Sequence, residues 1–306
     1  MRKQGTAMPL LHDRPSLTCM PLKHSHDAHH GLDHSLDDGG LIEILDLDAA
    51  VLAEHIADIT QWLPFDAQPR LIVDLGCGTG AGTFALLERF PDAHVIAVDS
   101  STSHLQRLRS KACEHGEEAR VRTVHADLDG PHWPDLGIPD LVWASASLHH
   151  MADPERALRM VHHLMAPGGL FAVVELADFP RFLPKDKPED RPGLEERCHA
   201  AGDRLRAGHM PHRGADWGPI LTAAGFTVEG KRTITVNIEG TRNRSVGAYA
   251  LSGLQRIRHG IADALDPEDL AALDRLLDTN NDHSILRRSD LLVRTERTVW
   301  AARRTA

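Results

Sequence analysis

An acidic residue followed by alternating glycines is the first pattern in this chain that suggests chemistry. The apolar run 71–75 contains Asp74, and glycines follow it at positions 76, 78, 80 and 82. Glycine has no Cβ, so the backbone can turn sharply there and lie against a ligand. A dinucleotide loop would instead have the spacing G-x-G-x-x-G, and the Asp74 carboxylate would repel a phosphate. The pattern favours a ligand with a cationic head group, with a tight turn that binds nothing as the alternative.

A second acid, Asp99, ends the apolar run 94–98. It follows the glycine loop by about 20 residues, the separation at which a Rossmann-type sheet places a carboxylate on the two ribose hydroxyls of a nucleoside. Adenosyl and nicotinamide cofactors both use this arrangement. Asp99 therefore predicts a nucleoside ligand without naming it, and the alternative is an acid that only caps the next helix.

Strand and helix patterns alternate around these residues. The apolar runs that predict the first strands are 71–75, 94–99, 120–124, 140–144 and 169–176. The alternation continues to about residue 225 and predicts a parallel sheet with helices on both faces. Two further strands are expected at 226–238 and 291–302, with a pair of helices between them. The fold class is thus α/β and Rossmann-like.

The order of these motifs resembles class I S-adenosylmethionine-dependent methyltransferases of the small-molecule type. The resemblance covers about residues 70–176 and includes Ser147-Leu-His-His, Asp153-Pro154 and Pro167-Gly-Gly around the fourth and fifth strands. It implies a seven-stranded sheet whose last strand is antiparallel and lies between the fifth and sixth. It also implies S-adenosylmethionine as the cofactor.

The resemblance assigns an acid after the third strand to the adenine ring. Asp127 comes first and is the predicted partner of the adenine amino group, with the backbone of Leu128 beside the ring; Asp129 competes for the role. A carboxylate only accepts hydrogen bonds and the exocyclic amine donates them, so the chemistry fits. The predicted cofactor-binding residues are Asp74, Gly76, Gly78, Gly80, Asp99, Ser100, Asp127, Leu128 and Ser145.

The implied reaction is methyl transfer to a small-molecule acceptor. The cofactor supplies the electrophile, and the protein aligns the acceptor and excludes water. A general base is needed only where the acceptor must lose a proton. Glu175, His149 and His150 are the predicted catalytic residues because they follow the fourth and fifth strands. Scaffold roles for the histidines, and a backbone or cofactor contact for Glu175, are the alternatives.

Two other functions remain open from the sequence. One is a catalytically silent S-adenosylmethionine-binding protein that acts through interactions, because binding motifs survive without turnover. The other is a nicotinamide-dependent oxidoreductase, against which the glycine spacing and Asp74 count. The acceptor and the methylated atom (O, N or C) are not readable from the sequence.

The domain organisation is predicted from changes in pattern along the chain. Residues 39–306 are expected to form one domain, and residues 1–38 a disordered, histidine-rich arm. Within the domain we expect a cofactor-binding core at 70–176, an acceptor or lid insert at 178–215 and a helical insert at 241–280. The segment 39–45 is a candidate cover for the site.

Composition limits the partners. The net charge of −10 argues against a nucleic-acid surface. The four cysteines form no C-x-x-C pair, so neither a zinc site nor a disulfide framework is predicted. A metal-binding tail is the alternative for the histidine-rich arm. No apolar stretch reaches the roughly 18 residues that suggest a membrane span. We expect a cytoplasmic protein without a membrane partner, and a homo-oligomer is one option for its assembly.

Overall fold

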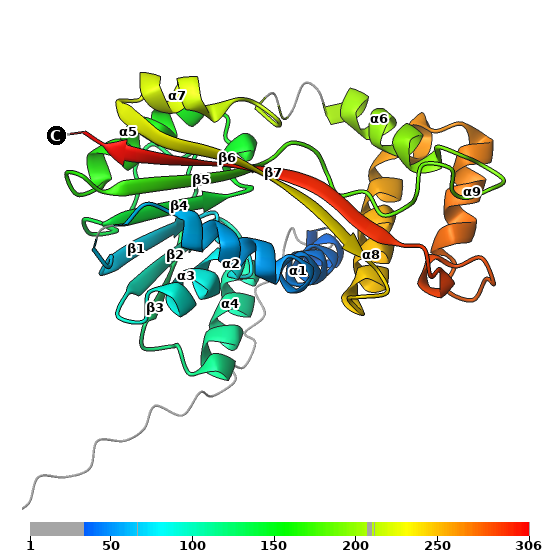
Figure 1. Ribbon diagram of the computed structural model, residues 1–306, viewed down its shortest axis with the longest axis horizontal. Coiled ribbons are helices and arrows are strands. Elements are labelled where there is room, and N and C mark those ends of the chain that lie inside the picture. The colour runs from blue at the N-terminus through cyan, green and yellow to red at the C-terminus, as the bar shows by residue number, and fades with distance from the viewer. Residues whose placement is uncertain (1–33, 66, 207–209, 211, 306) are drawn as a thin grey trace, which may run out of the picture. The chain divides into compact units, whose positions relative to one another are not determined.

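The computed structural model describes residues 34–65, 67–206, 210 and 212–305 (Figure 1). These described residues form one seven-stranded sheet in the order β3-β2-β1-β4-β5-β7-β6. The first five strands are parallel, and β7 is antiparallel to both of its neighbours, β5 and β6. The expected α/β class is confirmed, and so is the expected place of the last strand.

The strands have nearly the predicted bounds. They are β1 (Leu71–Leu75), β2 (His94–Asp99), β3 (Val121–His125), β4 (Leu141–Ser145), β5 (Leu170–Leu176), β6 (Phe226–Glu239) and β7 (Leu292–Arg304). Because β1 to β5 run the same way, their carboxyl ends meet at one edge of the sheet. The loops that carry the predicted site residues all leave from that edge.

Helices cover both faces of the sheet (Figure 1). The α-helices are α1 (His34–Val51), α2 (Ala53–Trp62), α3 (Ala81–Arg89), α4 (Thr102–His115), α5 (Pro154–Leu164), α6 (Leu194–Arg206), α7 (Trp217–Ala223), α8 (Ser245–Ile261) and α9 (Pro267–Leu277). Short 3-10 helices are η1 (Leu148–His150), η2 (Ala262–Ala264) and η3 (Ile285–Arg287). Trp143 of β4 packs in the core under α2 and α3, whereas Phe171 of β5 packs in the core under α5 and α7.

The strands β6 and β7 extend past the end of β5, toward α6, α8 and α9 (Figure 1). The last residue of β5, Leu176, pairs with Arg297, and β7 begins five residues earlier, at Leu292. The chain that follows β5 runs back along this free part of β7, where Arg181 and Arg294 exchange two backbone hydrogen bonds of 2.9 Å. The insert 178–215 therefore begins as an extra pairing on β7.

Helix α1 corrects one expectation. It begins at His34, inside the stretch 1–38 that was predicted to be a disordered arm, and the rest of that stretch, 1–33, lies outside the described residues. Gly39 and Gly40 disfavour a helix and weaken its sequence pattern. Packing of an apolar face against other elements is what stabilises most helices. Here Ile44 and Leu47 pack against the core.

The length and the apolar character of a helix together decide whether it can cross a membrane. Within the described ranges, no helix is long and apolar enough to do so.

Candidate functional site

The glycine loop after β1 has a backbone that only glycine adopts easily. Gly76, Gly78 and Gly80 have φ angles of +67°, +53° and +95°. A Cβ on Gly76 would lie 2.4 Å from the Cβ of Ser147, so the loop after β4 closes directly against it. The Gly76 and Cys77 amides donate to the carbonyl of Val98, which fixes the loop to β2. The spacing read from the sequence thus reflects steric need at the edge of the sheet.

Asp74 lies beneath this loop and is buried. Its Oδ2 accepts a hydrogen bond of 2.6 Å from the hydroxyl of Thr83 on α3. Burial, with a smaller contribution from the negative charge of Asp99, raises the pKa of Asp74 to about 7. A positive charge in the neighbouring space would stabilise its ionised form.

Asp99 organises the same loop from the end of β2. Its Oδ2 accepts from the Gly78 amide at 2.8 Å, and its Oδ1 accepts from the Ser101 amide at 2.8 Å. The Nδ1 of His104 lies 3.3 Å from Oδ1. Burial alone would raise the pKa of Asp99, but these hydrogen bonds outweigh it and lower the pKa. Asp99 is therefore held as a carboxylate.

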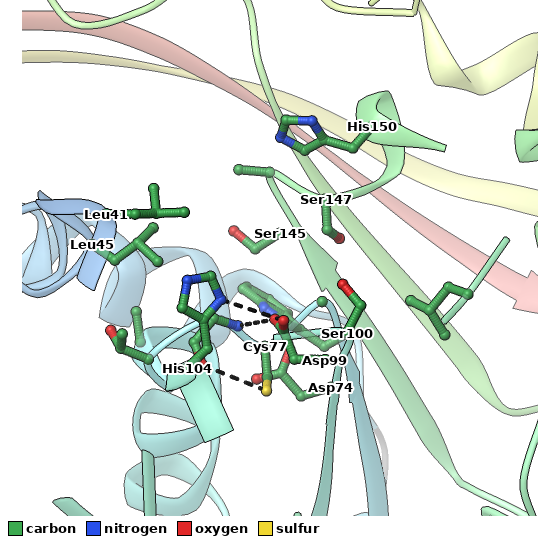
Figure 2. A pocket seen from close by; sticks show the side chains of 18 of the residues that line it. Leu41, Leu45, Asp74, Cys77, Asp99, Ser100, His104, Ser145, Ser147 and His150 are labelled. Atoms are coloured by element: carbon green, nitrogen blue, oxygen red, sulfur yellow. Dashed lines mark hydrogen bonds and ion pairs between the residues drawn. The ribbon is translucent and has the colours of Figure 1, made fainter. Parts of the chain in front are cut away.

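A cavity of about 430 Å³ lies over these groups. Figure 2 shows Asp74, Cys77, Asp99 and Ser100 on one side, and Leu41, Leu45 and His150 around the rest. All of the predicted cofactor residues except Gly80 line it: Asp74, Gly76, Gly78, Asp99, Ser100, Asp127, Leu128 and Ser145. Gly80 instead precedes α3 as its N-cap residue, and a Cβ there would lie 2.8 Å from the Phe84 ring.

The two acids after β3 have different surroundings. Both oxygens of Asp129 accept from the amide of Ala152, at 3.0 and 3.2 Å, which ties the loop after β3 to the loop after β4. From the described residues, Asp127 Oδ1 accepts one hydrogen bond, a local one from the amide of Asp129. Both residues line the cavity. The geometry leaves Asp127 better able to accept from a ligand.

Helix α1 forms one wall of the cavity through Leu41 and Leu45 (Figure 2). Asp46 on the same helix forms ion pairs with two residues of α4, Arg107 at 2.7 Å and Lys111 at 2.5 Å. The predicted cover segment 39–45 is therefore part of a helix, and that helix is fastened beside the glycine loop.

On its other side, α1 is fastened to the extended strands. Asp48 accepts from the hydroxyl of Tyr249 on α8 at 2.5 Å, and Nη2 of Arg297 on β7 lies 2.8 Å from both of its carboxylate oxygens. Asp48 and Arg297 also line the cavity. Although burial opposes it, the charge of Asp48 raises the pKa of Arg297.

The three predicted catalytic residues are close together but have different access to the cavity. Glu175 is buried, and its two oxygens accept from the amide of Leu148 at 2.9 Å and from Nδ1 of His149 at 2.5 Å. The His149 ring is also buried, with its centre 4.2 Å from that of His150. Of the three, His150 alone lines the cavity. Burial and the neighbouring His149 lower the pKa of His150.

The expectation that the insert 178–215 shares this pocket is not met in the described part of the insert. No described residue of that segment lines the cavity. The physical reason is the pairing of Arg181 with β7, which directs the segment along the strand.

Sequence reasoning missed several residues of the site. His104, Asp48, Trp143 and Arg297 line the cavity without having been predicted. His104 follows Asp99 by five residues and lies in the first turn of α4. This short spacing is a local signal from which its position could have been predicted. Arg297 has no local signal, because the antiparallel pairing of β7 with β5 brings it to the site.

Comparisons with known proteins agree with this geometry. Residues 73–171 match the family model of a methyltransferase domain. A trans-aconitate 2-methyltransferase from Methylobacterium radiotolerans is 37% identical over 117 residues, which cover 38% of this chain and 42% of the relative. A malonyl-(acyl-carrier protein) O-methyltransferase from Halorhodospira halophila is 33% identical over 188 residues, which cover 59% of this chain and 60% of the relative. The matches thus span 42% and 60% of these curated relatives.

A solved structure with the same fold extends the comparison beyond this segment. The phosphoethanolamine N-methyltransferase 2 of Haemonchus contortus, in complex with S-adenosyl-L-methionine, superposes with a TM-score of 0.51 and 13% identity, over 88% of this chain and 57% of that chain. At this identity the likeness concerns the fold alone. Residues 73–171 thus form a methyltransferase domain, and the strand order of the sheet is shared with solved methyltransferase structures.

Proposed function

We propose that this protein transfers a methyl group from S-adenosylmethionine to a small-molecule acceptor. The observation that carries the proposal is the row of carboxylates Asp74, Asp99 and Asp127 at the ends of β1, β2 and β3, all lining one cavity. A volume of about 430 Å³ lies in the range of roughly 300–1,000 Å³ that is typical of ligand pockets.

The residues present fit this cofactor. Asp127 would accept from the adenine amino group, and Asp99 from the ribose hydroxyls. Asp74 lies under the loop where the methionyl part would rest, and the positive charge of the cofactor would favour its ionised form. When bound, the cofactor supplies an electrophilic methyl group on a sulfonium. The chain orients it, with Leu41 and Leu45 of α1 helping to exclude water.

His150 is the residue that we propose as the general base for acceptors that must lose a proton. It lines the cavity, and its lowered pKa leaves the ring neutral and able to accept a proton near neutral pH. His149 and Glu175 act through it: the carboxylate of Glu175 holds both the η1 backbone and the His149 ring, and that ring packs against His150. We assign them a positioning role.

Calorimetry with S-adenosylmethionine, S-adenosylhomocysteine and NAD tests the cofactor. We expect the two adenosyl ligands to bind and NAD to show no measurable affinity. Preferential binding of NAD would contradict the proposal and favour the oxidoreductase.

Turnover needs a separate experiment. Release of S-adenosylhomocysteine is measured against a panel of carboxylic acids, amines and phenols. Methylation of one class would support the enzyme. Tight cofactor binding without turnover across the panel would favour a silent binding protein. A cytoplasmic location and a homo-oligomeric state remain predictions.

A further inference from the structure

Arginine side chains gather around one aromatic ring in the segment that follows β5. The guanidinium carbon of Arg206, at the end of α6, lies 5.1 Å from the centre of the Phe179 ring. That of Arg213 lies 4.8 Å from the centre of the same ring. The ring attracts both guanidinium groups. Two like charges are therefore held beside one side chain.

The neighbouring carboxylates are already paired with other arginines. Asp203 forms an ion pair with Arg213, and Asp178 forms one of 2.6 Å with Arg181. Among the residues that the structure describes, no carboxylate forms an ion pair with Arg206. Burial, together with the positive charges of Arg213 and Arg256, lowers the pKa of Arg206. A bound anion would relieve this unfavourable arrangement.

Several buried nitrogens of the cluster also lack hydrogen-bond partners within the described part of the chain. They are Nη1 of Arg181, Nε of Arg206, Nη1 of Arg213, and both ring nitrogens of His199. His199 is 1% exposed, and burial lowers its pKa to about 4, so it is a neutral ring. Buried polar groups are normally hydrogen-bonded, and donors without acceptors call for an acceptor-rich group. Carboxylates and phosphates are such groups, and arginine binds both strongly.

Arg256 of α8 connects this cluster with the candidate active site. Its charge lowers the pKa of His150, which lines the cavity, and also the pKa of Arg206 in the cluster. The chain itself makes a second connection, because Phe179 follows the end of β5 by three residues. The Phe179 ring thus follows, by three residues, the strand end that carries Glu175, whose carboxylate accepts from the His149 ring beside His150.

We propose that Arg206 and Arg213, which lie beside the Phe179 ring, form an anion-binding subsite for the methyl acceptor, whose carboxylate or phosphate group they bind. This inference rests on the proposed methyl transfer, since it names the acceptor's chemistry. The acceptor then reaches from the neighbourhood of His150 to the arginines, and its anionic group fixes its orientation.

The test uses the full chain loaded with S-adenosylhomocysteine. Inorganic phosphate and succinate are titrated separately by calorimetry, with ionic strength held constant by chloride. Loss of charge-assisted hydrogen bonds predicts that Arg206→Gln and Arg213→Gln each weaken anion binding by about tenfold or more. Arg242→Gln is the matched control, because it removes the same charge from a side chain that is 78% exposed. Its anion affinity should equal that of the wild type.

The outcomes separate the two proposals. Absence of anion binding by the wild type, or equal weakening by Arg242→Gln, would overturn the subsite. Arg213→Lys keeps the positive charge but not the planar group, so it should retain part of the anion affinity and tests the idea even if the Gln variants fold poorly. The tighter of phosphate and succinate identifies the acceptor's anionic group. If S-adenosylhomocysteine itself does not bind, the methyl-transfer proposal fails, whereas the titration can still be read on the unloaded protein.

Discussion

The two ends of the cavity are built in different ways. At the cofactor end, the predicted residues lie at or just after the carboxyl ends of parallel strands, and hydrogen bonds connect neighbouring loops there, as when Asp99 accepts from the amide of Gly78. At the other end, where we propose that the acceptor binds, elements from distant parts of the sequence meet, as α1, α8 and β7 do where Asp48 contacts Tyr249 and Arg297. Local sequence order thus determines the cofactor end, whereas the acceptor end depends on tertiary packing.

The largest expected effect separates the two ends by turnover. His150→Ala should lower the rate of methyl transfer by about 10²–10⁴-fold where the acceptor must lose a proton, because a positioned base contributes that much. Cofactor affinity should stay the same, since His150 lies at the acceptor end. The measurement is single-turnover kinetics beside calorimetry, with an acceptor identified by the panel.

Glu175→Gln is the companion variant. It keeps the shape of the side chain but disturbs the hydrogen bond to His149. We expect a smaller loss of rate and a shifted pH profile, because His150 itself remains. A fall in cofactor affinity that matches the fall in rate would remove the distinction between the two ends.

A smaller effect, on affinity alone, is expected at the cofactor end. Asp99→Ala should weaken S-adenosylhomocysteine binding at least tenfold, since charge-assisted hydrogen bonds contribute roughly 1.5–3 kcal/mol each. The melting temperature should fall as well, because the amides of Gly78 and Ser101 lose their acceptor. Asp99→Asn, which keeps one acceptor oxygen, is the matched control. It should retain part of the S-adenosylhomocysteine affinity and part of the melting temperature. An unchanged dissociation constant in Asp99→Ala would limit Asp99 to a capping role.

The smallest effect concerns Asp74 and pH. Its pKa is raised from 3.8 in the unfolded chain to about 7 in the folded protein, so the folded state binds more protons between these values. Its contribution to stability is therefore complete below the unfolded pKa and is lost as pH rises through the folded one. Asp74→Asn cannot ionise, so the stability of the variant relative to the wild type should increase with pH by on the order of 1 kcal/mol per unit.

Denaturant unfolding of both proteins at several pH values measures this difference. Glu195 also has a pKa raised to about 7. Because it is present in both proteins, its contribution to the pH dependence cancels when their free energies of unfolding are subtracted. A difference in stability that does not change with pH would show that Asp74 ionises normally in the folded protein.

The sequence predicted the cofactor end because its signals are local. Strand-end acids and steric glycines recur at spacings that the sheet imposes, so Asp74, Asp99 and Asp127 could be placed from their order along the chain. Glu175 shows the limit: its position at the end of β5 was predicted correctly, but the direction of its side chain follows from the amide of Leu148 and the ring of His149. Arg297 could not be found at all, because its place depends on the register between β7 and β5, which no local pattern in the sequence specifies.

The two attachments of α1 have a consequence for the exchange of bound molecules. On the α4 side, the partners of Asp46 are Arg107 and Lys111, whose side chains are 37% and 15% exposed. On the other side, the partner of Asp48 is Arg297, whose side chain is only 7% exposed. Salt screens exposed charges far more than buried ones. Added salt should therefore weaken the contact of α1 with α4 first, while its contacts with β7 and α8 persist. S-adenosylhomocysteine would then dissociate past the glycine loop, and its dissociation rate would increase with ionic strength.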